Sequence, residues 1–150
     1  MKRIILLAVA GPVLALFAAW GAFGFPKPVI VGPVVSVDNP RQDLGDLLVG
    51  NTAKPSFTIK NIGDAPLTLS VPRWPDVIEG CCPSQPELGK DELLPGESTT
   101  ISLEVAMHKG MGGKHLFQIQ VTTNDPQRPR VTLELASNWV NGKRPNSGKR

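Results

Sequence analysis

Every thiol, imidazole and thioether side chain after the initiator methionine falls into two short segments of the sequence. Both cysteines are adjacent, at Cys81-Cys82, and both histidines and two of the three methionines lie between Met107 and His115. Thiolate, thioether and imidazole groups together favour Cu(I), with Zn(II) second because methionine is a poor zinc ligand. The pattern predicts a soft-metal site with Cu(I) as its cofactor. Its candidate ligands are Cys81, Cys82 and His115, followed by Met107, His108 and Met111.

Each of these residues also has a simpler interpretation. Met107 can be the last core residue of a strand, His108 a solvated surface side chain, and His115 a cap on the core. Two adjacent cysteines outside the cytosol can instead oxidise to a strained vicinal disulfide or pair with another chain. A thiol-redox role is the weakest hypothesis, because an adjacent pair lacks the usual Cys-x-x-Cys spacing.

The elements that must position these residues are β-strands. Apolar and polar side chains alternate along five segments after Pro28, which places one face of each in a core and the other in water. These segments are 56–61, 67–71, 100–105, 117–122 and 131–136, and an earlier strand within 30–37 opens the domain. Residues typical of turns separate the segments. Short strands at this spacing, without helices, predict an all-β fold: an immunoglobulin-like antiparallel β-sandwich of about seven strands over residues 38–140.

The alternation also bears on the candidate metal site. Met107 continues the inward-facing positions of segment 100–105, and His115 continues those of segment 117–122. Across an antiparallel hairpin, these two side chains point to the same side. With one intervening strand, the loop that contains Cys81-Cys82 lies at the same end of the sandwich. We therefore expect the cysteines to face Met107 and His115.

The N-terminus carries an apolar run typical of a membrane anchor. Lys2-Arg3 precedes Ile4–Phe25, which contains no charged residue and is long enough to cross a bilayer core of roughly 30 Å as a helix. An uncleaved transmembrane helix over residues 1–25 is favoured over a cleaved signal, because Ala22-Phe23-Gly24 is a poor cleavage site. Residues 26–37 then form a linker and the first strand. The domain is expected on the extracytoplasmic side of the cytoplasmic membrane, single-pass, or secreted if the segment is cleaved.

Charge and motif content argue against nucleic-acid binding and catalysis. The formal charge of +3 arises at the two ends of the chain, whereas residues 27–142 hold 10 basic and 13 acidic side chains. A nucleic-acid binder needs a basic face on its folded domain. No serine or threonine has a histidine–carboxylate pair in a catalytic pattern, and Asp91-Glu92 has no mark of an acid–base dyad. We expect no enzymatic activity, no small-molecule substrate, and a disordered basic tail over residues 141–150.

Four motifs resemble those of a known bacterial family. They are Asp43-Leu44-Gly45-Asp46, FTIKNIGDAPLTL from Phe57, LLPGESTTISLEV from Leu93 and VTTNDPQRPRVTLEL from Val121. Together they resemble the bacterial domain of unknown function 1573 family, whose members look like the ASPM–SPD-2–hydin type of immunoglobulin-like module, over about residues 38–138. The resemblance implies an exported β-sandwich and supplies no biochemical activity. This chain has Gly80-Cys81-Cys82-Pro83 where many members carry Cys-Gly-Cys, so it resembles a subgroup with a Cys-Cys loop and a Met/His hairpin.

Three functions are therefore open at the level of sequence. The first is binding or delivery of Cu(I) on the outer face of the membrane. The second is a structural or interaction module that binds another envelope protein without metal. The third is a thiol-redox role of Cys81-Cys82.

Overall fold

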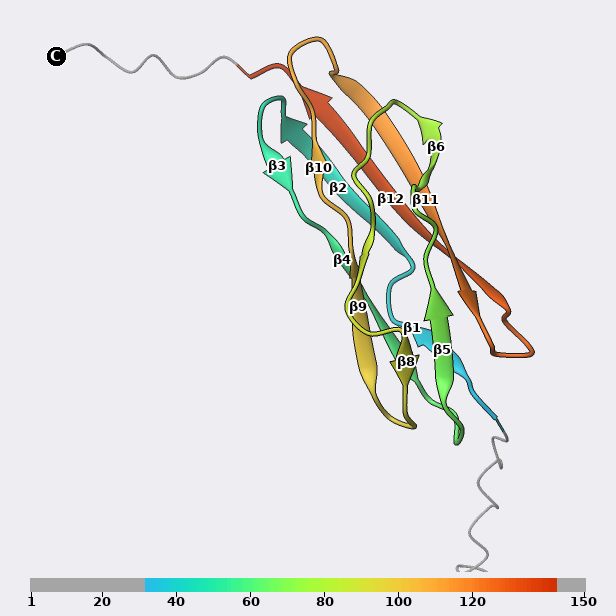
Figure 1. Ribbon diagram of the computed structural model, residues 1–150. Coiled ribbons are helices and arrows are strands. Elements are labelled where there is room, and N and C mark those ends of the chain that lie inside the picture. Colours follow the sequence, from blue (N-terminus) through green and yellow to red (C-terminus); the bar gives the residue numbers. More distant parts are fainter. Residues whose placement is uncertain (1–31, 143–150) are drawn as a thin grey trace, which may run out of the picture.

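The computed structural model describes residues 32–142, in which every regular element is a β-strand (Figure 1). The larger sheet has the order β2-β12-β11-β5-β8, and β6 pairs with the N-terminal half of β11. These strands are β2 (Arg41–Leu48), β5 (Leu67–Ser70), β6 (Asp76–Glu79), β8 (Glu92–Leu93), β11 (Gly113–Thr123) and β12 (Arg130–Val140).

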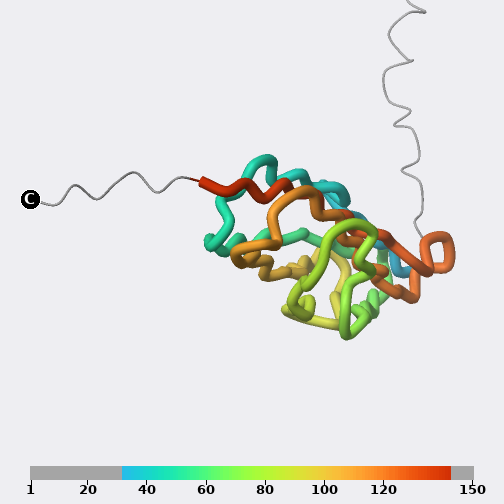
Figure 2. The backbone as a smooth tube through the Cα atoms, turned by 90° about the horizontal axis from the view of Figure 1, so that it is seen from above, coloured from blue at the N-terminus to red at the C-terminus, as the bar shows by residue number. Residues whose placement is uncertain are grey.

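The second sheet has the order β1-β4-β9-β7. Its strands are β1 (Val35–Val37), β4 (Ser56–Asn61), β7 (Glu87–Leu88) and β9 (Ser98–Ser102). A further pair joins β3 (Thr52–Ala53) to β10 (Val105–Ala106). Figures 1 and 2 show the two sheets facing each other as the layers of a sandwich.

The core lies between the sheets because successive strand side chains point to opposite faces. The strand β4 alternates strictly between exposed and buried residues, with Phe57 and Ile59 facing inward. Phe117 and Ile119 on β11 and Trp139 on β12 close the core from the opposite sheet, each at most 2% exposed. Full burial of each such apolar side chain contributes about 1.5–3 kcal/mol, an amount that substitution by a polar residue would forfeit.

One strand pair departs from the expected antiparallel arrangement. Strand β2 runs parallel to β12, with Arg41 opposite Glu134 and Leu48 opposite Val140. The register shifts by one residue on β2 at Gly45, whose φ of +64° lies in the left-handed region that glycine adopts without strain. The bulge lets β2 keep pairing along most of β12 and leaves its charged side chains on the outer face.

The immunoglobulin-like all-β prediction is confirmed, and the observed β4, β5, β9, β11 and β12 overlap the five expected segments. The strand count is higher than about seven because several edges are built from two-residue strands, and the Leu-Gly-Asp segment forms β2. No helix within residues 32–142 has the length and apolarity that crossing a membrane requires. The predicted helix over 1–25 and most of the predicted tail lie outside the described residues.

Candidate functional site

The Cys loop, Gly80–Pro83, directly follows β6 and has an unusual backbone. Gly80 has φ +85°, and Cys82 has φ +62°, the one positive value for a non-glycine residue within 32–142. Both cysteines are free thiols, Cys81 partly buried and Cys82 exposed. The pKa of Cys81 is raised by its hydrogen bond with Cys82, then by burial and by the neighbouring charge of Cys82. The side chains of Cys81 and Cys82 are therefore in hydrogen-bonding contact with each other.

The side chain of His115 lies directly beneath this loop. It is only 4% exposed, and its Nδ1 lies 3.1 Å from the carbonyl oxygen of Gly113. Because a carbonyl oxygen only accepts, Nδ1 donates this bond, and in the tautomer with a single proton on Nδ1 the lone pair is on Nε2. A Cβ built on Gly80 would lie 2.2 Å from Cδ2 and 2.8 Å from Nε2 of His115. The backbone of the Cys loop thus packs on the imidazole, at the sandwich end where β6 and the turn before β11 meet (Figure 1).

The three other candidate ligands lie in different surroundings. Met107 has no exposed surface and belongs to the hydrophobic core, so it is a packing residue at the end of its strand. Met111 is partly buried against that core, and its N–H donates to the carbonyl of His108 at 2.9 Å. His108 is exposed to solvent.

The six predicted ligands therefore lie in different surroundings: core, partly buried and exposed. Within residues 32–142, no three His, Cys, Asp or Glu side chains are grouped so that they could hold a metal ion. The thioether of Met107 packs in the hydrophobic core, and a metal shared by Met107 and both cysteines stays a prediction. What the structure does bring together is the Cys loop and His115.

A second feature, on β6 and the loop before it, was not predicted. Six large apolar side chains within 32–142 are about half exposed, and three of them are Trp74 (53%), Val77 (46%) and Ile78 (56%). All four residues of β6 are exposed, and the strand pairs with β11 alone. Val77 lies opposite buried Phe117, so it points toward the core side of the sheet and is still uncovered. We call Trp74, Val77 and Ile78 the β6 patch.

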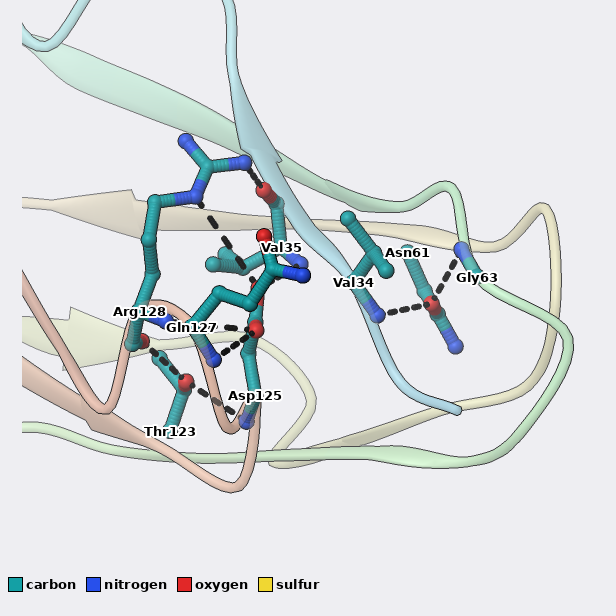
Figure 3. Close-up of polar contacts among 8 residues, drawn as sticks. All are labelled: Val34, Val35, Asn61, Gly63, Thr123, Asp125, Gln127 and Arg128. Atoms are coloured by element: carbon teal, nitrogen blue, oxygen red, sulfur yellow. Dashed lines mark hydrogen bonds and ion pairs between the residues drawn. The ribbon is translucent and has the colours of Figure 1, made fainter. Parts of the chain in front are cut away.

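Two motif residues that carried the family resemblance have structural roles. Asp125, 2% exposed, accepts hydrogen bonds from the N–H groups of Val35 at 3.0 Å and Gln127 at 2.8 Å, and lies beside the Arg128 guanidinium (Figure 3). Burial alone would raise the pKa of Asp125, but these donors outweigh burial and lower it. Asp125 therefore ties the β11–β12 turn to β1 across the sandwich.

Asn61 makes a comparable connection on the other sheet. Its Nδ2 donates to the carbonyl oxygens of Ala65 at 2.8 Å and Leu93 at 2.9 Å. Its Oδ1 accepts from the N–H of Gly63, as Figure 3 shows. Fully buried, Asn61 satisfies its amide within the protein, as buried polar groups must. The turn composition of both motifs is a sequence signal for these roles, although only the structure shows the distant partners.

The fold and these internal connections define an immunoglobulin-like module. The HYDIN/CFA65/VesB-like Ig-like domain profile matches residues 33–138, and the chain belongs to this family. The finer resemblance to the domain of unknown function 1573 family stays a prediction. No curated protein sequence matches the chain.

Solved structures show the same fold at low sequence identity. A protein of unknown function from Porphyromonas gingivalis W83 is 22% identical, with a TM-score of 0.58, and the match covers 75% of this chain and half of that one. PapD-like domain 7 of human CEP192 is 12% identical, with a TM-score of 0.55, covering 95% of this chain and all of that domain. The secreted serine protease VesC of Vibrio cholerae is 14% identical, with a TM-score of 0.54, and the match covers 73% of this chain and 24% of that protein.

Proposed function

We propose that this chain is a non-catalytic protein-interaction module of the cell envelope, held on the outer face of the cytoplasmic membrane by Ile4–Phe25. The observation that carries the proposal is the β6 patch. It holds three of the six large exposed apolar side chains of residues 32–142, all of them within the five-residue segment 74–78. Soluble domains rarely leave such patches exposed unless they bind something.

The proposed partner supplies an extended segment that pairs with the outer edge of β6. Strand addition gives affinity through main-chain hydrogen bonds and specificity through side-chain contacts. Val77 lies on the core side of the sheet without a cover, so an apolar side chain of the partner can complete the sandwich there. Trp74 adds a large amphipathic contact of the kind that is enriched at binding hot spots.

Site-specific photocrosslinking in the native host tests this proposal. A photoreactive amino acid replaces Ile78 in one variant and Leu94 in a matched control, because these residues are similarly exposed (56% and 52%) and Leu94 lies away from β6, directly after β8. We expect one defined protein adduct at position 78, with the crosslink mapped to an extended apolar segment, and none at position 94. Equal adducts at both positions, or none at 78, would contradict an interaction through β6.

The contact between His115 and the Cys loop favours a second candidate function, soft-metal binding at Cys81, Cys82 and His115. Histidine ligands typically donate their other ring N–H to a carbonyl, as Nδ1 does to Gly113 here, which leaves Nε2 ready to bind. Two adjacent thiols supply the soft donors that Cu(I) prefers. The loop would have to rearrange, because no complete ligand group is present among residues 32–142.

Anaerobic titration of the reduced protein with Cu(I) against a competing chelator tests this candidate. We expect competition by the wild type, loss in Cys81→Ser/Cys82→Ser, and weakening in His115→Gln but not in His108→Gln. Failure of the wild type to compete removes the metal function and leaves the interaction function standing. A loss of two hydrogens in mass without metal would favour the disulfide and a thiol-redox role instead.

A further inference from the structure

The outer face of the large sheet contains a pocket of about 400 Å³, which shares His115 with the candidate metal ligands and Glu79 with β6. Its floor is a cross-strand row in which Leu116 and Ala136 lie between Glu79 on β6 and Asp43 on β2. The lining residues are Arg41, Asp43, Gly45, Asp46, Glu79, Lys114, His115, Leu116, Ala136, Ser137 and Asn138. An apolar floor between two carboxylates fits the aliphatic stem and charged head of a lysine or arginine.

The charges around this pocket are unbalanced. Arg41 is paired with Glu134 through Nε and Oε1 at 2.9 Å. The carboxylates of Asp43, Asp46 and Glu79 form no ion pair within residues 32–142, although Asn138 donates a hydrogen bond to Asp46 at 2.8 Å. Lys114 is the remaining cation of the lining. Three carboxylates therefore face one ammonium group, and the pocket favours a cationic occupant.

The sequence supplies such an occupant next to the pocket. Residues 143–150 (KRPNSGKR) contain four basic and no acidic side chains. Asn138 lines the pocket, and β12 ends at Val140, so the basic segment starts five residues beyond a lining residue. Eight residues span up to about 26–29 Å when extended.

We propose that residues 143–150 bind this pocket on the outer face of β2, β12, β11 and β6 through their lysine and arginine side chains. Tethering gives the segment an effective concentration in the millimolar range. Exposed ion pairs are individually weak, so the contact depends on several of them acting together and is sensitive to salt. A second copy of the chain or a basic segment of another protein could present the same chemistry, and the experiment separates these occupants.

Carbodiimide cross-linking of the full chain in detergent micelles, followed by peptide mass spectrometry, tests the proposal. The reagent joins lysine amines to carboxylates that lie within contact distance. We expect Lys143 and Lys149 to link to Asp43, Asp46 or Glu79 in preference to all other carboxylates, and the yield to fall severalfold in 1 M salt, where the Debye length is about 3 Å. An equal mixture of ¹⁴N- and ¹⁵N-labelled chains should give these links within single chains only.

Matched variants complete the test. Asp43→Asn/Asp46→Asn/Glu79→Gln keeps side-chain shape and should also lower the yield of tail links to the neighbouring carboxylate Glu134, because the tail is no longer held at the pocket. Asp91→Asn/Glu92→Gln, at the start of β8 and at the other end of the sandwich (Figure 1), should leave the pocket links unchanged. Far-ultraviolet circular dichroism confirms folding of both variants. Links spread evenly over the acidic residues of the wild type would overturn the proposal, and so would links between differently labelled chains. Absence of any tail link to the pocket in the wild type would also overturn it, whatever the variants do.

Discussion

Replacing Asp125 with Asn should destabilise the fold more than any other neutralisation of a single carboxylate among residues 32–142. Asp125 is 2% exposed and accepts from the N–H of Val35, a residue with no exposed surface of its own. In the Asn variant, the N–H of Val35 faces either the side-chain NH₂ group or the uncharged amide oxygen, which is a poorer acceptor than a carboxylate. A hydrogen bond to a charged group contributes about 1.5–3 kcal/mol, and the half-exposed Arg128 adds less than about 1 kcal/mol. We expect a loss of about 2–3 kcal/mol.

Urea unfolding of residues 27–150, followed by circular dichroism, measures this effect. With a slope of about 1–1.5 kcal/mol per molar, the midpoint should fall by about 2 M, while the exposed-site control Asp91→Asn should change stability by less than about 0.5 kcal/mol. The folded-state pKa of Asp125 is lowered below its unfolded value of about 3.9. Its contribution is therefore complete above that value and lost as pH falls through the folded pKa.

The difference between wild type and Asp125→Asn should accordingly be constant from about pH 5 to 7 and shrink below about pH 4. An equal difference at pH 3 and pH 7 would show that charge at Asp125 is not what stabilises the turn. No difference at neutral pH would show that Val35 finds another acceptor, and the structural role assigned to Asp125 would be wrong.

Three further substitutions test the site by the same unfolding measurement. Gly80→Ala should cost about 2–3 kcal/mol, because its Cβ has no room, whereas Gly96→Ala, at a similar φ of +84° with open space, should cost about 1 kcal/mol; equal costs would refute the close packing. Met107→Ala should cost about 2–5 kcal/mol and His108→Ala less than about 0.5; a small cost at 107 would refute a core role. Cys82→Gly should stabilise by up to about 1–2 kcal/mol, and any loss would show that the thiol contact outweighs the backbone strain.

Alternation predicts a strand only where the two faces differ. β4, β11 and β12 have one buried and one solvated face, so their period of two is visible in the sequence. The sequence of β2 does not alternate regularly, because β2 is a charged edge strand with a glycine bulge. Its partner β12 lies about 90 residues away in the sequence. β6 has four exposed residues and hence no alternation at all. A local sequence pattern therefore does not predict a strand that forms mainly because it pairs with a distant segment.

The same limit applies to the candidate site. Side-chain parity correctly gives the side on which Met107 and His115 lie, because direction alternates along a strand. The alternation does not show how deeply a side chain is buried, however. The degree of burial is what distinguishes a thioether that packs in the core from one that can bind a metal. The fit of Gly80 against His115 was equally invisible, since a contact between a loop backbone and an imidazole leaves no periodic trace.

The packing of Gly80 on His115 makes the two candidate functions mechanically dependent on each other. β6 ends at Glu79, Gly80 follows without space for movement toward the ring, and Cys81-Cys82 come next. A metal that draws both thiols toward Nε2 of His115 must therefore displace Gly80. Because Gly80 is covalently joined to Glu79, that displacement acts on the end of β6 and the adjoining patch. If both functions operate, Cu(I) should change partner binding at β6, and by linkage the partner should change Cu(I) affinity by the same factor. A partner affinity that is identical with and without bound metal would show that the loop moves independently of the strand.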